Sequence, residues 1–212
     1  MLLYAQDIAH SFDTLLYENV HLTLQQGESI AILGVSGSGK STLLANLSTL
    51  LMPNVGKVDI LGNDVYKLKA NERLKLLREK LGIIFQAHYL FRGFSALENL
   101  QVGGILAKQN IDMELLENLG IAHTLTQNSA DLSGGQQQRL SIARVLLKKP
   151  KVIFADEPTG NLDKDTTHNV MEAIRAYVAK HKSGLIIATH DESIAKECNK
   201  VYRIYEQGLQ QL

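Results

Sequence analysis

The stretch GVSGSGKST, from Gly34 to Thr42, places a lysine and several hydroxyls among glycines. It satisfies the pattern G-x-x-x-x-G-K-[ST], in which glycines let backbone N–H groups turn toward phosphate oxygens. Lys40 would reach the outer phosphates, and the Ser41 hydroxyl would face a magnesium ion. A plain glycine-rich turn is disfavoured, because an apolar run precedes the loop and a helical pattern follows it. The pattern predicts a nucleoside triphosphate site formed by Gly34, Ser36, Gly37, Ser38, Gly39, Lys40, Ser41 and Thr42.

Two adjacent carboxylates, Asp156 and Glu157, end the apolar run VIFA. Side chains alternate along a strand, so the two should point different ways at its carboxyl end, where open α/β sheets bind ligands. Asp156 would hold magnesium, directly or through water. Glu157 would orient and activate a water molecule against the terminal phosphorus. The alternative is that the pair only caps the next helix.

Two more polar residues end apolar runs in the same way: His190 follows LIIAT and Gln86 follows LGIIF. His190 could donate to the γ-phosphate and help to place the water. Gln86 could contact magnesium or water without adding charge. A lone histidine at a strand end is more often structural. The other six histidines show no metal-ligand spacing, so we predict no metal site beyond magnesium.

A second glycine loop, LSGGQ from Leu132 to Gln136, precedes a strongly helix-forming run. It offers the Ser133 hydroxyl and the backbone N–H groups of Gly134 and Gly135, but no lysine or arginine. Such a loop suits a phosphate whose charge is already balanced by Lys40 and magnesium. We therefore expect the second loop to close over the ligand of the first. Spacing does not decide whether it does so within one chain or between two copies.

The motifs in this order resemble those of an ABC-type ATPase, over essentially the whole chain. The resemblance rests on LSGGQ, the lysine loop, Gln86, VIFADE, the stretch EPTGNLD from Glu157 to Asp163, and His190. It implies that two copies pack head to tail, each covering the ATP of the other with Ser133, Gly134, Gly135 and Gln136.

The resemblance also implies roles for single residues. It makes Glu157 the catalytic glutamate, Asp156 the magnesium-binding aspartate and His190 the switch histidine. It places a D-loop at Asn161, Leu162 and Asp163. An aromatic side chain ahead of the lysine loop would stack on adenine. Phe12 is the best match, with Tyr17 as the other choice and a core phenylalanine as the plain alternative.

The stretches EPTGNLD and FSALENL, the latter from Phe94 to Leu100, are similar to the ATPases of bacterial lipoprotein release, macrolide export and cell division. Those proteins couple ATP to a membrane partner. In them the segment after Gln86 lines a groove for the permease, with Phe91, Phe94 and Leu97 as apolar candidates here; ordinary core packing is the alternative. The stretch from Glu98 to Asp131 is shorter than in these relatives, and no proline follows Gln86. The alternative function is a regulatory ATPase of the cell-division type, with a membrane partner but no cargo.

The motifs require a scaffold of alternating strands and helices. Apolar runs at 29–33, 81–86, 151–157 and 184–190 predict buried strands, and patterns at 42–51, 70–80, 165–182 and 192–197 predict helices. Such alternation implies a parallel sheet covered on both faces. Residues 1–27 alternate as antiparallel strands do, and 56–65 reads as a hairpin turning at Gly62 and Asn63. Residues 87–150 read as a helical insertion.

The predicted fold is therefore α/β: a P-loop NTPase of ABC type, with a RecA-like parallel-sheet core, an antiparallel β subdomain and an inserted helical subdomain. We expect one ABC ATPase domain over 1–212. Residues 1–86 and 151–212 would form the catalytic core with the N-terminal β subdomain, and 87–150 the helical subdomain that carries LSGGQ.

Composition narrows the partners. The chain has 212 residues, with Lys plus Arg and Asp plus Glu both at 22, so no basic excess draws it to nucleic acid. No apolar stretch approaches about 18 residues, so a membrane role requires a separate permease chain. The single cysteine, Cys198, and the missing leader favour a reducing cytoplasm. We expect a protein on the cytoplasmic face of the inner membrane that binds ATP, Mg²⁺, a second copy of itself and a permease.

Overall fold

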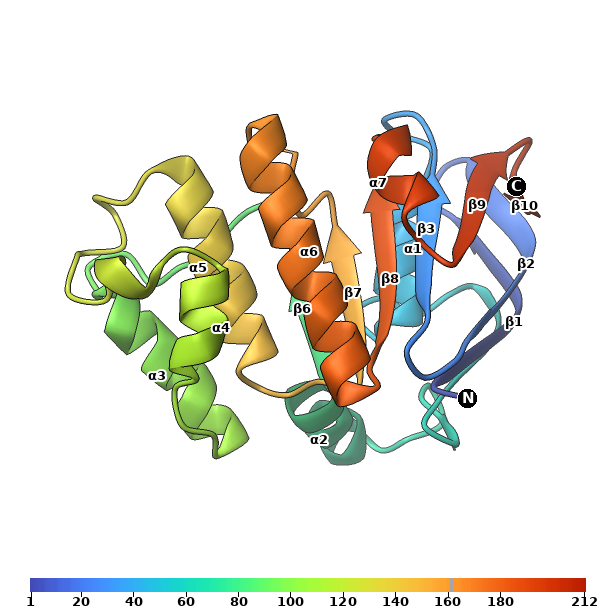
Figure 1. Cartoon of the computed structure of the whole chain (residues 1–212). Coiled ribbons are helices and arrows are strands. Elements are labelled where there is room, and N and C mark those ends of the chain that lie inside the picture. Colours follow the sequence, from blue (N-terminus) through green and yellow to red (C-terminus); the bar gives the residue numbers. More distant parts are fainter. Residues whose placement is uncertain (161) are drawn as a thin grey trace.

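The computed structural model describes residues 1–160 and 162–212, with the backbone alone at residues 106 and 107. Its larger sheet has the strand order β10-β9-β3-β8-β7-β6. Strands β3 (Ser29–Leu33), β6 (Leu81–Ile84), β7 (Val152–Asp156), β8 (Gly184–Thr189) and β9 (Lys200–Tyr205) run parallel, and β10 (Gly208–Gln211) is antiparallel to β9. The carboxyl ends of β3, β7 and β8 therefore meet at one edge (Figure 1). This confirms the predicted parallel sheet.

The smaller sheet is antiparallel, in the order β2-β1-β4-β5. Its strands are β1 (Leu3–Ser11), β2 (Leu15–Leu24), β4 (Val55–Ile60) and β5 (Asn63–Asp64). It lies beside β3, β9 and β10 of the larger sheet, as Figure 1 shows. The Glu18 N–H donates to the Gln207 carbonyl at 2.8 Å, which links β2 to the turn before β10. The predicted antiparallel strands are thus present beside the parallel sheet.

Alternating side chains of the central strands enter two different apolar clusters. In β7, Ile153 and Ala155 pack on one face, whereas Val152 and Phe154 pack on the other. The first face is covered by α6 (Lys164–His181), α5 (Gly134–Leu146) and α7 (Glu192–Lys196). The second is covered by α1 (Lys40–Leu47) and the antiparallel sheet. Burial on both faces explains why these strands are uninterrupted apolar runs.

Residues 87–150, all of which the structure describes, contain helices and no strand. They form α3 (Ala96–Ala107), α4 (Met113–Asn118), a short 3-10 helix (Ala122–Thr124) and α5. Leu100, Leu116 and Leu140 from this segment join the same cluster as Ile153 of the sheet. The helical segment therefore shares the core of the sheet. The exact division at residues 86 and 151 stays a prediction.

Some element boundaries differ from those predicted. Helix α1 begins at Lys40 rather than Thr42, because Gly39 adopts φ 95° and caps it, and it ends at Leu47 rather than Leu51. Strand β6 ends at Ile84, so Gln86 lies beyond the strand. Strands β9 and β10 were not predicted, because their half-buried residues make no apolar run. Helix α2 (Ala70–Lys80) has the predicted bounds.

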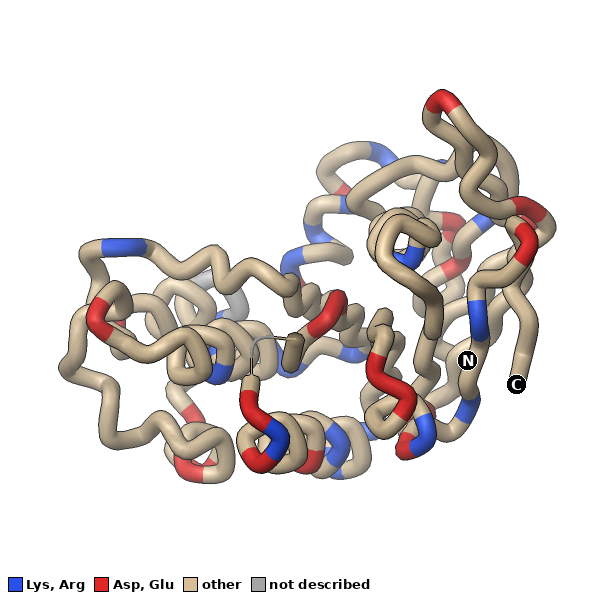
Figure 2. Tube along the Cα trace, turned by 90° about the horizontal axis from the view of Figure 1, so that it is seen from above, with Lys and Arg blue, Asp and Glu red and all other residues tan. Residues whose placement is uncertain are grey.

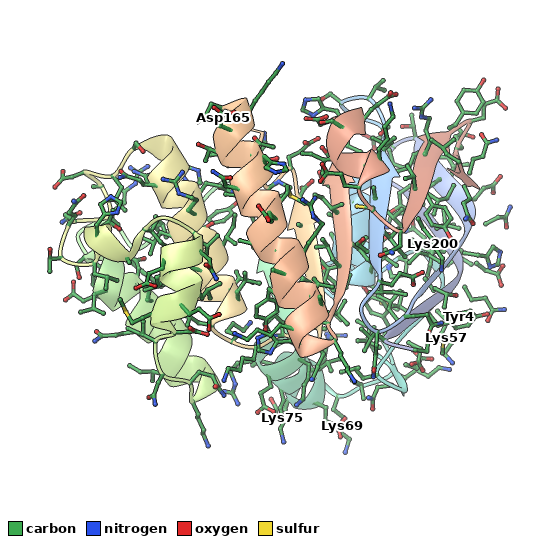
Figure 3. The ribbon with its side chains drawn as sticks, in the orientation of Figure 1. Tyr4, Lys57, Lys69, Lys75, Asp165 and Lys200 are labelled. Atoms are coloured by element: carbon green, nitrogen blue, oxygen red, sulfur yellow. The ribbon has the colours of Figure 1, made fainter. Side chains whose placement is uncertain are left out.

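Charged residues of both signs are distributed along the whole trace (Figure 2). Lys69 and Lys75 project at the α2 end of the molecule, away from Asp165 at the start of α6 (Figure 3). Among the helices of the described residues, none is both long enough and apolar enough to cross a bilayer.

Candidate nucleotide site

The loop between β3 and α1 folds tightly because of its glycines. Gly37 and Gly39 have φ of 80° and 95°, in the left-handed region that side chains other than glycine rarely adopt. A Cβ on Gly39 would lie 3.3 Å from the ring of Tyr17, and one on Gly34 would collide with Ser38 Oγ. Among the described residues, no side chain caps the start of α1. Its first N–H groups therefore face the loop, which suits an anion.

Lys40 is buried at the centre of this loop, with a side chain only 8% exposed. Its Nζ donates to the carbonyl oxygens of Gly34 at 2.8 Å and Val35 at 3.1 Å. The same Nζ lies 4.0 Å from Glu157 Oε1. The lysine and the second carboxylate of β7 are therefore brought together, as the motifs predict.

Asp156, the last residue of β7, lies beside the same loop. Burial raises the pKa of its carboxyl group; the Ser41 hydroxyl and Lys40 act in the opposite direction, and Glu157 raises the pKa further. Its Oδ1 is buried and has no hydrogen-bond partner among the described residues. An orphaned carboxylate oxygen next to a hydroxyl matches what Mg²⁺ uses, because this ion binds one or two carboxylates together with substrate phosphates. The residues present therefore fit a magnesium ion.

Glu157 follows the end of β7 with φ 44°, a strained conformation for a residue other than glycine. Its Oε1 lies 2.9 Å from Nδ1 of His190, and its Oε2 accepts a hydrogen bond from Thr189 Oγ1 at 3.3 Å. The Glu157 side chain is 14% exposed, whereas that of His190 is 70% exposed. Thr189 was missed in the sequence. Its signal is its position, because it is a hydroxyl one residue before His190 at the end of the same apolar run.

A cleft of about 700 Å³ is lined by Lys40, Ser41, Gln86, Glu157 and His190, together with Ser36, Gly37, Gly39 and Thr42 of the loop. Asp156, predicted for magnesium, and Thr189 are not among its lining residues. Phe12, Leu16 and Val35 add apolar surface to the cleft, and the sequence singled out only Phe12 of these. Leu16 and Val35 carry no signal that separates them from core residues. A cleft lined by a buried lysine, loop backbone and apolar side chains suits a nucleotide.

The two aromatic alternatives for the base occupy different positions. Phe12 is 64% exposed and lines the cleft. Tyr17 is fully buried, and its hydroxyl donates to Asn46 Oδ1 at 2.7 Å. The structure thus brings Phe12, and not Tyr17, to the surface of the cleft.

Several predicted nucleotide-binding residues do not line this cleft. Gly34 and Ser38 face each other inside the loop. Ser133 caps α5: its Oγ accepts from the Gln136 N–H at 3.2 Å, and its own N–H donates to Gln136 Oε1 at 2.9 Å. Asp163 caps α6 and accepts two hydrogen bonds from Thr166, which lower the pKa of its carboxyl group.

The LSGGQ residues Ser133, Gly134, Gly135 and Gln136 and the D-loop residue Asp163 thus lie outside the cleft of their own chain. Asn161, the first predicted D-loop residue, lies outside the described residues. The assignment of these residues to a nucleotide stays a prediction.

Helix α5 contacts both the turn that follows β7 and the segment after Gln86. Gln138 Nε2 donates to the Pro158 carbonyl at 2.7 Å, next to Glu157. The Arg144 guanidinium donates to the carbonyls of His88 and Tyr89 and lies 5.7 Å from the ring centre of Phe91. Sequence spacing had not indicated either link, because each joins residues distant along the chain.

The predicted groove residues are partly accessible. Phe91 and Phe94 are exposed, with ring centres 5.7 Å apart, and Leu97 is half-buried. A cavity of about 650 Å³ lies at the same segment and is lined by Gln86, His88, Tyr89, Arg92 and Gln137 among others, but not by Phe91, Phe94 or Leu97.

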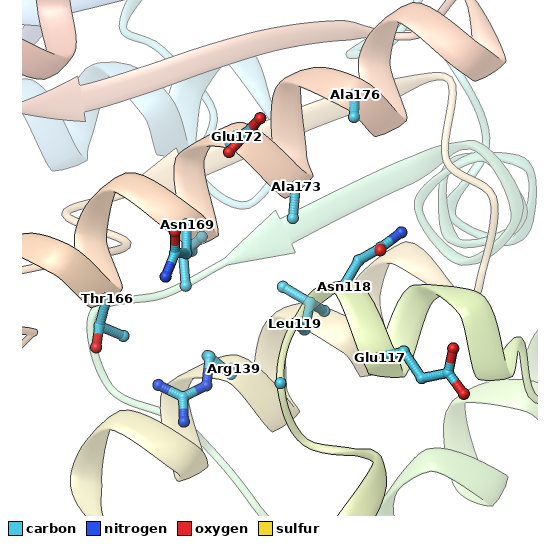
Figure 4. A pocket seen from close by; sticks show the side chains of 11 residues that line it. Glu117, Asn118, Leu119, Arg139, Thr166, Asn169, Glu172, Ala173 and Ala176 are labelled. Carbon is cyan, nitrogen blue, oxygen red and sulfur yellow. The ribbon is translucent and has the colours of Figure 1, made fainter.

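Another cavity, of about 600 Å³, lies between α4, α5 and α6. Arg139, Asn169 and Leu119 are among the residues that line it (Figure 4). It contains none of the residues predicted for the nucleotide.

Comparison with known proteins places these features in a family. The family model described as ABC transporter matches residues 17–160. The lipoprotein-releasing system ATP-binding protein LolD of Xanthomonas campestris pv. campestris (strain 8004) is 36% identical, over 94% of this chain and 86% of that protein. The protein of the same description from Novosphingobium aromaticivorans is 39% identical, over 88% of this chain and 86% of its own length.

Solved structures agree. A dimeric ATP-binding cassette in a post-hydrolysis state, bound to ADP and Pi, superimposes with a TM-score of 0.89 and 27% identity, covering 100% of this chain and 99% of that one. A dimeric bacterial ABC transporter cassette gives a TM-score of 0.87 and 29% identity, covering 98% and 96% of the two chains.

Proposed function

This chain belongs to the ABC transporter family of ATPases, and from that premise we propose that it dimerises on ATP and drives a separate transmembrane permease of the lipoprotein-release or efflux type. The observation that carries the proposal is the cleft itself. Lys40, Ser41, Gln86, Glu157 and His190 meet in it, while the LSGGQ loop lies elsewhere in the same chain. A complete site then needs the loop of a second copy.

The phosphate chain would lie along the loop from Ser36 to Thr42. Lys40 now bonds two neutral carbonyls of that loop, and phosphate oxygens would take over those hydrogen bonds, because an anionic acceptor adds Coulomb attraction to the ammonium group. The adenine would lie against Phe12. The position of Lys40 and the exposure of Phe12 support this orientation.

Ser41 and Asp156 would hold magnesium, with Gln86 close enough to contact it or its water. When bound, this ion neutralises the charge that develops on the phosphate oxygens. The buried, unpartnered Asp156 Oδ1 supports the assignment.

Glu157 would act as the general base. Its carboxylate is fixed by His190 and Thr189 and lies 4.0 Å from Lys40 Nζ, so it is poised at the phosphate end of the cleft. It would accept a proton from water as that water attacks the γ-phosphorus in line. Lys40 and His190 would stabilise the transition state. Loss of the γ-phosphate would then release the LSGGQ loop of the partner and open the dimer.

The exposed aromatics after Gln86 would receive the permease. Phe91 and Phe94 form an apolar surface that Arg144 fixes from α5. Opening of the dimer would reach the permease through this surface, and the chain would work at the cytoplasmic face of the inner membrane. The similarity to lipoprotein-releasing proteins supports the choice of partner class.

Co-purification tests the partner. An affinity-tagged chain taken from solubilised membranes should carry a permease with four spanning helices and a large periplasmic domain.

In the Phe91→Asp variant the amount of co-purified permease should fall by about tenfold or more, because a charge in an apolar interface is costly. The ATPase activity of the isolated chain should stay unchanged. Tyr205→Asp, at another exposed aromatic residue, on β9, is the control. A partner that moves no cargo would indicate the regulatory alternative, and no membrane partner at all would contradict the proposal.

A further inference from the structure

Phe12 needs a support if it is to stack on a base. It follows β1 and is 64% exposed, and its N–H bonds only the Thr14 carbonyl two residues on, at 3.2 Å. A large exposed ring on a turn is free to change rotamer unless a neighbour restricts it. The neighbour that packs against this ring is His10, two residues earlier in the chain.

His10 is nearly completely buried, with 3% of its surface exposed. Its ring centre lies 4.8 Å from that of Phe12, and the two rings are inclined by 72°. This is the edge-to-face arrangement that aromatic rings favour. In this pair His10 is buried in the protein, whereas Phe12 borders the cleft.

Asn46 of α1 fixes the position of the His10 ring. Asn46 Nδ2 donates to the Leu51 carbonyl at 2.9 Å, which can only accept, so the amide orientation is determined. The same nitrogen makes a longer contact of 3.4 Å with His10 Nδ1, which must then be the acceptor. Asn46 itself is fully buried, so the network excludes water.

The network continues to the phosphate loop. Asn46 Oδ1 accepts from the Tyr17 hydroxyl at 2.7 Å. The Tyr17 ring packs beneath Gly39, the residue that caps α1. The buried chain His10, Asn46, Tyr17 therefore joins the support of Phe12 to the loop that holds the phosphates.

We infer that His10 is a positioning residue for the nucleotide base: its ring holds Phe12 in the stacking orientation, and Asn46 holds His10. The inference rests on the proposed role of Phe12 in the cleft. It assigns the His10 ring an effect on the base through Phe12. A substitution that keeps an acceptor for Asn46 leaves Asn46 and Tyr17, the part of the network that reaches the phosphate loop, in place.

Binding measurements with two probes test this. The dissociation constants of Mg·ATP and of inorganic tripolyphosphate are measured by competition with a fluorescent nucleotide. His10→Gln keeps an acceptor for Asn46 but removes the ring. It should weaken ATP by about three- to tenfold, the range that one aromatic pair supplies, and leave tripolyphosphate unchanged. In a Phe12→Ala background the same substitution should have no further effect. His123→Gln, a surface histidine of the 3-10 helix, is the matched control.

The outcomes are separable. If Phe12→Ala weakens ATP and His10→Gln does not, the inference is overturned while the proposed function stands. If His10→Gln weakens both probes equally, His10 has only a structural role and the inference is again overturned. If Phe12→Ala leaves ATP binding unchanged, the assignment of Phe12 fails, and with it the support by His10. If the Gln variant does not fold, His10→Leu replaces it.

In the unsubstituted chain, ring protons of His10 and Phe12 should show nuclear Overhauser contacts with each other when ATP is bound. Loss of those contacts would overturn the inference by itself.

Discussion

At the scale of single residues, the site depends on two carboxylates with opposite surroundings. Glu157 is hydrogen-bonded on both oxygens, by His190 and Thr189, and lies near Lys40. Asp156 has an unpartnered buried oxygen and a raised pKa. One carboxylate is held in place by hydrogen bonds, as the proposed proton transfer would need, and the other has a buried oxygen without a partner among the described residues, as the proposed magnesium ligand would.

Glu157→Gln should retain ATP binding and reduce turnover by about a hundredfold or more, because a positioned base contributes at least that factor. The trapped nucleotide should also hold the chain as a dimer. Phosphate release and size-exclusion chromatography with ATP measure both effects. Glu192→Gln on α7, whose carboxylate pairs with Arg203 at the surface, is the control. Turnover at the level of the unsubstituted chain would remove Glu157 from its role.

Asp156→Asn should stabilise the metal-free protein. Because burial raises the folded pKa, this group contributes stability below its ordinary pKa near 3.8, and that contribution is lost as pH rises through the folded pKa. At pH 7 the charged form is therefore unfavourable. In EDTA the variant should unfold a few degrees higher than the parent, a gain on the order of 1 kcal/mol. In a separate scan without EDTA, the stabilisation that Mg·ATP gives the parent should be lost in the variant. Thermal scans from pH 4 to 8 check this, because the variant should melt above the parent by more at pH 8 than at pH 4. An equal difference in melting temperature between variant and parent at the two pH values would contradict the prediction.

At the scale of elements, α5 connects three parts of the site. Its first turn is the LSGGQ loop, with Ser133 and Gln136 capping each other. Gln138 bonds the Pro158 carbonyl beside Glu157. Arg144, further along, bonds the His88 and Tyr89 carbonyls under the aromatic surface. A rotation of α5 would therefore move all three together.

Helix α3 offers a matched comparison for the cap of α5, because Ser95 and Glu98 form the same capping box there. Ser133→Ala and Ser95→Ala should each lower the free energy of unfolding by about 0.5–2 kcal/mol. Only Ser133→Ala should also reduce turnover of the isolated protein, because α5, unlike α3, begins with the loop proposed to face the ATP of a second copy. Urea unfolding and phosphate release give the two quantities. An equal loss of turnover in both variants would mean that the cap acts through stability alone.

At the scale of the whole molecule, the cleft of one chain is half of the proposed catalytic centre. It is lined by Lys40, Glu157 and apolar side chains such as Phe12, but not by the LSGGQ loop. Two identical chains related by a twofold axis would complete two such centres at once. Similar solved cassettes are dimers, which agrees with this arrangement.

Mixed dimers distinguish the two placements of the loop. Lys40→Ala should lose ATP binding, and Ser133→Arg should bind ATP but fail to dimerise with itself productively. A one-to-one mixture should regain up to about half of the parent activity, because neither variant dimerises productively with itself and each mixed dimer has one intact centre of two. Lys40→Ala mixed with the double variant is the control and should stay inactive. A mixture as inactive as its components would indicate a loop that acts within its own chain.

The sequence by itself determined the chemistry and the parallel scaffold. The lysine loop, VIFADE and the strand ends at Gln86 and His190 are local patterns, and the carboxyl ends of parallel strands must meet at one edge. The apolar runs of β3, β7 and β8 were recognisable because both of their faces are buried. Strands β9 and β10 were not, because their residues are mostly half-buried or exposed and make no apolar run.

Only the tertiary structure decided which aromatic borders the cleft, what fixes Glu157, and how α5 reaches the catalytic strand. Tyr17 and Phe12 are both aromatic residues ahead of the lysine loop, and they differ only in burial against Asn46. The bonds from Gln138 to Pro158 and from Thr189 to Glu157 join separate elements. Such contacts depend on how whole helices and strands pack, and no spacing along the chain encodes that packing.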